Sequence, residues 1–326
     1  MSARPRGANK DTDWDSAYHA PVLATEVVGV LGSADYVLDG TLGGGGHALA
    51  LLESDVGRVI GIDRDPDALA AARERMASFE TQDRFRAYLG NYATLDDIPA
   101  LAEERFGGIL LDLGISSHQI NESRRGFTFR EDAPLDMRMG GSCASETATA
   151  ADLLNNLDEQ SLAAIFREYG DEGRAPRLAR EIVRRRATHA FAVSDDLVRA
   201  VRGALGPRTG PADFARLFQA VRIAVNDELA SLSRALPNLR DRLRDGGVLA
   251  VIAYHSGEDR LVKHAFREWS SACVCPPKHI VCTCRGRPLG ELIGRKAVTA
   301  SPAEVSRNPR ARSARLRSFR ATPGVT

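Results

Sequence analysis

The chain has 326 residues, of which 43% are hydrophobic and 27% are charged, and its formal net charge is +1. These fractions are ordinary for a globular protein, and the length allows one large domain or two smaller ones. No apolar run approaches the roughly 20 residues of a transmembrane helix, so a membrane is not expected as a partner. Residues 1–18 lack the apolar core of a signal peptide; we expect a disordered lead and a cytoplasmic protein.

The most informative stretch is D-G-T-L-G-G-G-G-H at 39–47, which follows a short apolar run. Glycine lets bare backbone approach a ligand and takes positive φ angles without strain. A strand, a glycine loop and a helix start together predict a nucleotide-type site. The next apolar strand, V-I-G-I-D, ends in Asp63, whose carboxylate can accept both ribose hydroxyls of an adenosine.

The spacing of the glycines separates two classes of cofactor. A dinucleotide site needs G-x-G-x-x-G, with a helix N-terminus at the pyrophosphate. Here Asp39 heads the loop, and glycines follow at 40 and 43–46. An acidic residue in that place suits a ligand that carries an ammonium group, as S-adenosylmethionine does. The stretch therefore favours S-adenosylmethionine over a nicotinamide cofactor.

The first half of the chain alternates strand and helix patterns. Strands are predicted at 36–41, 58–63, 85–89 and 108–113, and helices at 21–31, 48–53, 67–78 and 95–102. This βαβα order predicts an α/β fold with a parallel, doubly wound sheet.

Beyond residue 113 the pattern becomes helical. A loop at 114–142 precedes helices predicted at 148–156, 158–169, 175–188, 194–205 and 212–236, the last ended by Pro237, and a strand returns at 247–254. An all-helical block inside an α/β sheet is most simply an inserted domain. We therefore predict an S-adenosylmethionine-binding domain over 19–124 and 211–326, and a helical insert for substrate recognition over 125–210.

Two residues at strand ends are catalytic candidates. Asp112 ends the apolar run I-L-L-D, and His255 follows the strand at 247–254. The carboxyl ends of parallel strands share a crevice where ligands bind, so both side chains are expected there. Each also has a structural alternative, as a buried helix cap for Asp112 and as a structural histidine for His255.

The segment R-G-F-T-F-R-E-D-A-P-L-D-M-R-M at 125–139 is crowded with charged and aromatic residues. Aromatic rings interleaved with arginine can stack bases and hold phosphates. The alternative is a loop packed on its own side chains with internal ion pairs. The sequence alone does not separate the two.

Four of the five cysteines form close pairs, C-V-C at 273–275 and C-T-C at 282–284, and Cys143 stands alone. Two such pairs, with His279 as an extra ligand, could bind zinc. The usual spacing is C-x2-C, so no metal is assigned, and a disulfide is not expected in the cytosol.

The C-terminal segment is strongly basic. From Arg285 to Arg320 it contains ten lysines or arginines and two acids, a net charge of +8. A basic arm indicates a polyanionic partner, and a solvated tail is the alternative. A third possibility is that Arg315 and Arg317 fold back as a lid over the cofactor.

Taken together, these motifs resemble the RsmH (MraW) family of bacterial ribosomal RNA methyltransferases. The matching pieces are H-A-P-V-L at 19–23, D-G-T-L-G-G-G-G-H at 39–47, I-D-R-D-P at 62–66, L-L-D-L-G-I-S-S at 110–117, R-G-F-T-F at 125–129, P-L-D-M-R-M at 134–139, F-Q-A-V-R-I-A-V-N-D-E-L at 218–229, H-S-G-E-D-R at 255–260 and N-P-R-A-R-S-A-R-L-R at 308–317. The resemblance implies a Rossmann-like class I methyltransferase sheet with an inserted all-helical domain. It also implies S-adenosylmethionine-dependent methylation of the N4 amine of a cytidine in the decoding region of 16S rRNA.

The resemblance also implies which residues contact the cofactor, namely Gly45, Gly46, His47, Asp63, Tyr92, Asp112 and Gln119. His118 and Asn121 stand where the family pattern has Pro and Asp, and Gly257 stands where it has Leu. These departures weaken the expected contacts of the loop around Gln119. The expected partner is small-subunit rRNA or the 30S subunit, and a homodimer is compatible with the sequence.

Other functions remain open to the sequence. They are a methyltransferase that acts on DNA or a small molecule, a non-catalytic RNA-binding assembly factor, and a nicotinamide-dependent oxidoreductase, which the glycine spacing disfavours. The proton acceptor for the N4 amine is expected to be Asp112, His255 or a backbone carbonyl.

Overall fold

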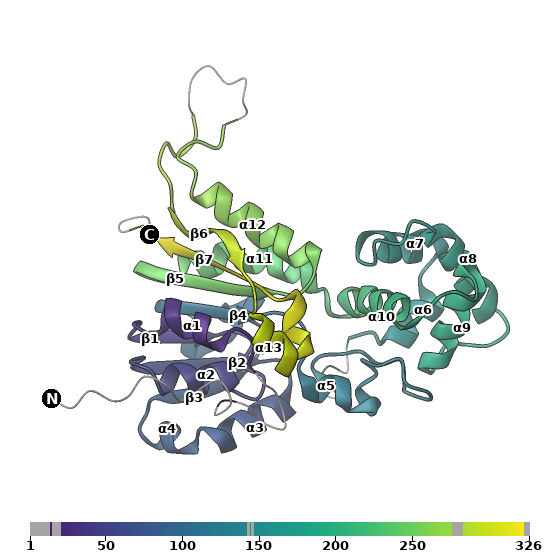
Figure 1. Cartoon of the computed structure of the whole chain (residues 1–326), viewed down its shortest axis with the longest axis horizontal. Helices are drawn as coiled ribbons and strands as arrows, with labels where there is room; N and C mark the ends of the chain where they lie inside the picture. The colour runs from purple at the N-terminus through teal and green to yellow at the C-terminus, as the bar shows by residue number, and fades with distance from the viewer. Residues whose placement is uncertain (1–13, 15–20, 142–143, 145–146, 276–282, 323–326) are drawn as a thin grey trace. The chain divides into compact units, whose positions relative to one another are not determined.

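The computed structural model describes residues 14, 21–141, 144, 147–275 and 283–322 (Figure 1). These divide into two compact units, one formed by Met1–Gly114 with Leu232–Thr326 and the other by Ile115–Ser231. Among the described residues, no helix is both long and apolar enough to cross a membrane.

The first unit is built on a seven-stranded sheet in the order β3-β2-β1-β4-β5-β7-β6. Its strands are β1 (Tyr36–Asp39), β2 (Arg58–Asp63), β3 (Phe85–Leu89), β4 (Phe106–Asp112), β5 (Leu243–Ala253), β6 (Gly290–Val298) and β7 (Arg315–Ala321). The first five are parallel, and β7 runs antiparallel to both β5 and β6. The doubly wound α/β fold, with the class I methyltransferase sheet, is confirmed.

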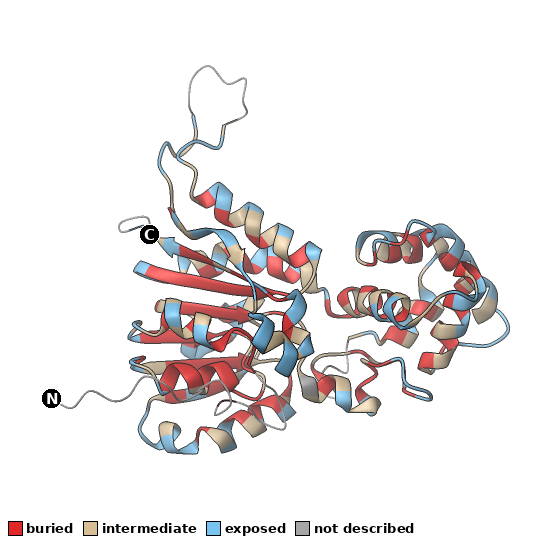
Figure 2. Cartoon of the chain, in the orientation of Figure 1, coloured by how far each residue is buried: buried red, intermediate tan, exposed pale blue. Residues whose placement is uncertain are grey.

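Hydrophobic clusters cover both faces of this sheet. Along β1, Val37 packs with α1 (Ala24–Leu31), α2 (Gly46–Leu52) and α3 (Pro66–Arg75), whereas Leu38 packs with α11 (Glu228–Asp241) and α12 (Ser256–Trp269). Successive strand residues point to opposite faces, which explains why central strands are apolar throughout. Figure 2 shows the central strands buried and the edge strand β6 largely exposed.

The second unit is helical. Its helices are α5 (Ser117–Asn121), α6 (Ala150–Asn156), α7 (Glu159–Glu168), α8 (Ala175–Arg186), α9 (Ser194–Leu205) and α10 (Pro211–Asn226). The sequence placed the insert at 125–210, but α10 contributes Phe214, Leu217 and Phe218 to the hydrophobic core of the helical unit. The insert is therefore wider than predicted because α10 packs on the helices before it.

The long helix predicted at 212–236 is wrong. Asp227 takes a left-handed conformation, with φ of 51°, and separates α10 from α11. Pro237, predicted to end a helix, lies inside α11. The helix predicted at 95–102 is instead two short 3₁₀ segments, Tyr92–Asp97 and Pro99–Leu101, with Pro99 at the start of the second.

The basic C-terminal segment is neither a solvated tail nor a free arm. It forms β6, the helix α13 (Pro302–Arg307) and β7, which pairs with β5 over six residues. Leu316, Ser318 and Phe319 are buried, so the segment does have an apolar face. The sequence did not predict this strand because arginines alternate with the buried residues.

Most of the predicted disordered lead, residues 1–18, lies outside the described residues. Trp14 is described and is buried. Its indole nitrogen donates to Glu53 Oε2 at 2.9 Å, and its carbonyl accepts a hydrogen bond from Arg75 at 2.5 Å. At this position the chain is held against the sheet unit and is not disordered.

Candidate functional site

Three carboxylates end three neighbouring parallel strands. Asp39 ends β1, Asp63 ends β2 on one side of it, and Asp112 ends β4 on the other. In the sheet register Asp39 lies opposite Gly61 of β2 and Leu110 of β4. Parallel strands end at the same edge of a sheet, so the three acidic groups converge there.

Asp39 is 1% exposed. Its Oδ1 accepts the backbone N–H of Thr41 at 3.2 Å, and its Oδ2 is buried with no hydrogen-bond partner among the described atoms. Burial is the main cause that raises the pKa of Asp39 to about 7, with further contributions from Asp112 and Asp63. A buried, half-satisfied carboxyl group is suited to a ligand that donates hydrogen bonds or carries positive charge.

Asp63 links the end of β2 to the glycine loop. Its Oδ2 accepts the backbone N–H of Gly43 at 2.7 Å, and its Oδ1 accepts that of Asp65 at 2.9 Å. Burial outweighs these hydrogen bonds and raises the pKa of Asp63 to about 6. Each carboxylate oxygen can accept more than one hydrogen bond, so the group keeps acceptor capacity for a ligand.

The glycines of the loop differ in what a side chain at each position would contact. A Cβ built at Gly43, where φ is +51°, meets nothing within 4 Å, so this face of the loop is open to a ligand. A Cβ at Gly45, where φ is +75°, would lie 2.3 Å from the methyl carbon of Met76, and one at Gly46 would lie 3.0 Å from Pro21. Protein packing thus explains Gly45 and Gly46, whereas Gly43 fits the prediction of a bare surface.

His47 lies in the first turn of α2 and is buried. Its Nε2 is 2.8 Å from the carbonyl oxygen of Val22, to which it donates when protonated there. Its Nδ1 is 3.7 Å from Asp112 Oδ2. His47 therefore connects the segment before α1 to the carboxylate that ends β4.

Asp112 is held from two further directions. Its backbone N–H donates to Thr41 Oγ1 at 2.6 Å, and its Oδ1 accepts the hydroxyl of Tyr254 at 2.8 Å. Burial, followed by the charge of Asp112, raises the pKa of Tyr254 well above its usual value. The tyrosine therefore remains a donor at neutral pH. Sequence reasoning missed Tyr254, although its place directly after β5 was a usable signal.

His255 acts as the N-cap of α12. Its Nδ1 accepts the backbone N–H groups of Gly257 and Glu258 at 3.2 and 3.5 Å. Its Nε2 lies 3.2 Å from Glu258 Oε1 without hydrogen-bond alignment, and is otherwise buried without a partner among the described atoms. This arrangement is the structural alternative to the predicted catalytic role.

Tyr92 and Gln119 lie on different units. Tyr92 follows β3 beside the glycine loop, because a Cβ at Gly40 would lie 3.1 Å from the Cβ of Tyr92. Gln119 belongs to the helical unit, where it is buried and forms a capping box with Ser116 at the start of α5. Its predicted contact with the cofactor stays a prediction.

The segment 125–139 is packed on itself and on α10. Arg125 is buried and donates to the carbonyl of Met139 at 2.7 Å, and Arg138 pairs with Asp136 at 2.8 Å. Asn226 of α10 donates to the carbonyl of Met137 at 2.8 Å and accepts the N–H of Met139 at 2.8 Å. These contacts favour the self-packed loop over a loop of free RNA-binding side chains.

Comparisons with known proteins cover nearly the whole chain. The model of the MraW methylase family matches residues 16–322. The chain is 62% identical over 303 residues to "Ribosomal RNA small subunit methyltransferase H" of Gemmatimonas aurantiaca, a match that spans 93% of this chain and 95% of that protein. It is 46% identical to the protein of the same name from Heliobacterium modesticaldum, over 92% of this chain and 97% of that one. A solved rRNA methylase from Streptococcus thermophilus matches with a TM-score of 0.40 at 10% identity, over 92% of this chain and 93% of that one.

Proposed function

Since the chain belongs to the MraW methylase family, we propose that it methylates ribosomal RNA of the small subunit with S-adenosylmethionine as methyl donor. The methylated atom is the N4 amine of a cytidine in the decoding region. The substrate is 16S rRNA, free or within the 30S subunit, and the reaction takes place in the cytoplasm.

The observation that carries this proposal is the match to small-subunit rRNA methyltransferases over more than nine-tenths of both chains. The choice of the cytidine N4 amine rests on the motifs that resemble the RsmH family. The convergence of Asp39, Asp63 and Asp112 at one sheet edge supports a reaction centre in that place.

The residues at the sheet edge fit S-adenosylmethionine. The open face at Gly43 leaves room for a ligand against bare backbone, and the Asp63 carboxylate keeps acceptor capacity that suits the ribose hydroxyls. The unpartnered Oδ2 of Asp39 suits the ammonium group of the methionine part. The proposed cofactor contacts are Gly45, Gly46, His47, Asp63, Tyr92, Asp112 and Gln119. When bound, the cofactor supplies an electrophilic methyl group.

The substrate amine needs alignment and a proton acceptor. The N4 lone pair of cytosine is delocalised into the ring, so the enzyme gains most from holding it in line with the methyl group. Asp112 is our proposed acceptor, because its carboxylate lies at the strand end with one oxygen fixed by Tyr254. His255 is less suited, because its ring accepts backbone N–H groups at the start of α12.

A basic surface of the sheet unit suits the RNA backbone. Lys263 and Arg267 of α12 line a small pocket together with Arg295 and Lys296 of β6. Clustered cations on one surface contact phosphates and make binding salt-sensitive. This surface replaces the free C-terminal arm as the proposed RNA contact.

The test is mass-spectrometric mapping of methylated nucleosides in small-subunit rRNA from cells with and without this protein. N4-methylcytidine should disappear from one decoding-region position without the protein. It should return when wild-type protein, but not the Asp112→Asn variant, is supplied. An unchanged rRNA map would reject small-subunit rRNA as the substrate. Methylation of added DNA, or of a different rRNA atom, would reject the cytidine N4 amine as the methylated group.

A further inference from the structure

Three cysteines meet at the base of the loop between α12 and β6. Cys273 and Cys275 follow α12, and Cys284 precedes β6. The loop ends are tied together, since the N–H of Leu289 donates to the carbonyl of Trp269 at 2.7 Å. Arg285, next to Cys284, donates to the carbonyl of Ser271 at 3.2 Å. The two cysteine-bearing segments are therefore held side by side.

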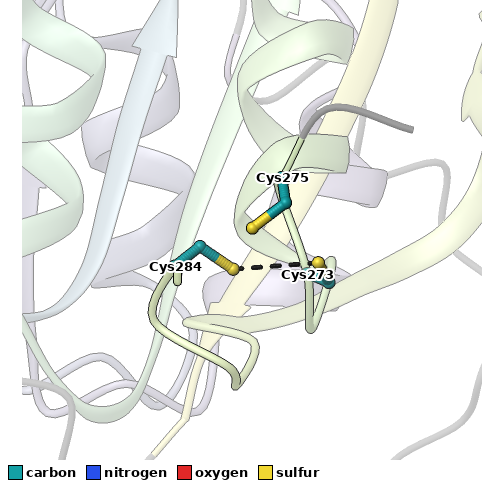
Figure 3. Close-up of side chains that lie close together, drawn as sticks. All are labelled: Cys273, Cys275 and Cys284. Carbon is teal, nitrogen blue, oxygen red and sulfur yellow. Dashed lines mark hydrogen bonds between the residues drawn. The ribbon is translucent and has the colours of Figure 1, made fainter. Parts of the chain in front are cut away.

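The thiols point toward one another, as Figure 3 shows. All three sulfur atoms lie within 4.8 Å of one another, and Cys284 Sγ is 3.8 Å from Cys273 Sγ. The backbone N–H of Val274 also donates to Cys284 Sγ at 3.4 Å. A backbone N–H aimed at sulfur stabilises the thiolate form, which is the form that binds metals.

The sulfur separations match a metal site better than a disulfide. A zinc–sulfur bond is about 2.3 Å, and tetrahedral geometry then separates two sulfur ligands by about 3.8 Å. A disulfide needs about 2.05 Å between sulfur atoms. Thiolates are soft ligands that select zinc, copper(I) or iron–sulfur clusters over hard cations.

We propose that Cys273, Cys275 and Cys284 bind one zinc ion that closes the loop between α12 and β6. The C-x-C spacing departs from the usual C-x2-C, but the structure brings Cys284 from the other segment to within 4.8 Å of Cys273 and Cys275. His279 and Cys282, considered with these cysteines in the sequence, lie outside the described residues, as does Cys143.

The proposed zinc is structural. Tyr254, at the candidate site, lies just before the start of α12, and the cysteines lie beyond the other end of this 14-residue helix at Trp269. A helix of that length spans about 21 Å. Zinc should therefore hold the loop and the approach to β6 without taking part in methyl transfer, so this inference does not depend on the proposed function.

The experiment measures metal and thiols in the full-length protein. After purification under reducing conditions without chelator, elemental analysis should find one zinc per chain. Cobalt(II) added to chelator-treated protein should give the near-ultraviolet absorption of cobalt–thiolate bonds. Three or more thiols should resist a thiol reagent until a chelator is added.

Matched variants assign the ligands. Cys273→Ser, Cys275→Ser and Cys284→Ser should each lose the zinc, while Cys143→Ser should keep it. Protein that binds neither zinc nor cobalt, or single variants that retain full zinc, would overturn the proposal. So would mass spectrometry that finds a Cys273–Cys284 disulfide in the freshly purified wild type. The cobalt spectrum of the wild-type protein tests metal binding by the thiols even where the variants fold poorly.

Discussion

The hydroxyl of Tyr254 donates a 2.8 Å hydrogen bond to Oδ1 of Asp112. Tyr254 follows β5 and Asp112 ends the neighbouring parallel strand β4, so the contact lies at the sheet edge that holds the candidate site. The other carboxylate oxygen faces His47 Nδ1 at 3.7 Å. The bond from Tyr254 and the neighbouring His47 ring therefore fix the orientation of the Asp112 carboxylate.

The first prediction is that Tyr254→Phe slows methyl transfer while the protein stays folded. Loss of the donor frees the Asp112 carboxylate to rotate, and we expect kcat to fall about tenfold, or about 1.4 kcal/mol in the barrier. Single-turnover methyl transfer at saturating cofactor measures this. Tyr36→Phe, at the opposite end of β1, is the control. An unchanged rate would mean that Tyr254 serves packing alone.

The second prediction concerns pH. The pKa of Asp63 is raised to about 6, and its ionised form is the stronger acceptor for the ribose hydroxyls. Cofactor affinity should therefore rise as the pH increases from 5 to 7, with a slope that approaches tenfold per unit well below pH 6. Calorimetric titration across this range measures it. In Asp63→Asn the cofactor affinity should be weaker and its dependence on pH shallower. An equal slope in both proteins would mean that a group other than Asp63 titrates.

The stability of the ligand-free protein should change with pH in the opposite direction. Asp63 and Asp39 have folded-state pKa values of about 6 and about 7, above the ordinary 3.8. The folded state thus binds their protons more tightly, and this contribution is present below pH 3.8 and is lost as the pH rises through 6 and 7. Urea unfolding at several pH values should show Asp39→Asn and Asp63→Asn reducing that loss.

The sequence predicted the parts of the site that depend on local pattern. Asp39, Asp63 and Asp112 were predictable because an apolar strand ending in an acid fixes both the strand and its end. Tyr254 was not, because its bond to Asp112 depends on which strands are neighbours. The strand β7 was not predicted because it contains Arg315, Arg317 and Arg320. Cationic residues indicate a solvent-exposed tail unless their ion-pair partners are known.

The third prediction separates capping from catalysis at His255. His255→Ala should destabilise the protein by about 1 kcal/mol, the usual cost of losing an N-cap. His255→Asn should recover most of that loss, because asparagine is a good N-cap. If His255 only caps α12, methyl transfer per folded molecule should be near normal in His255→Asn. A fall of a hundredfold or more in the methyl-transfer rate of that variant would instead support His255 as the proton acceptor.

The fourth prediction concerns Asn226 in the helical unit. Its amide joins Met137 and Met139 to α10 through two hydrogen bonds and makes a third, within α10, to the carbonyl of Arg222. Asn226→Leu keeps the volume but leaves buried backbone groups unpaired, and we expect a loss of about 3 kcal/mol. Urea unfolding measures it, with Asn156→Leu at an exposed position as control. Equal stability of the two variants would contradict the assigned role.

The last prediction concerns the basic C-terminal segment. Truncation after Ser306 removes β7, whose Phe319 is fully buried and packs 5.7 Å from Phe266 and 5.3 Å from Trp269 between ring centroids. The truncated chain should fail to fold, which circular dichroism and thermal unfolding would reveal. A folded, cofactor-binding truncation would contradict the role of β7 in the sheet.

Single arginines then separate stability from RNA binding within the same segment. Arg317 donates to both oxygens of Asp259, at 2.7 and 3.2 Å, and both side chains are largely buried. Arg317→Ala should cost about 2 kcal/mol of stability, because the carboxylate loses a charge-assisted pair. Arg295→Ala, at an exposed position on the proposed RNA surface, should leave stability unchanged and reduce the salt dependence of RNA binding by about one unit of slope. If both variants lose the same stability, the exposed arginine is also structural. Exposure would then not identify the arginines that bind RNA.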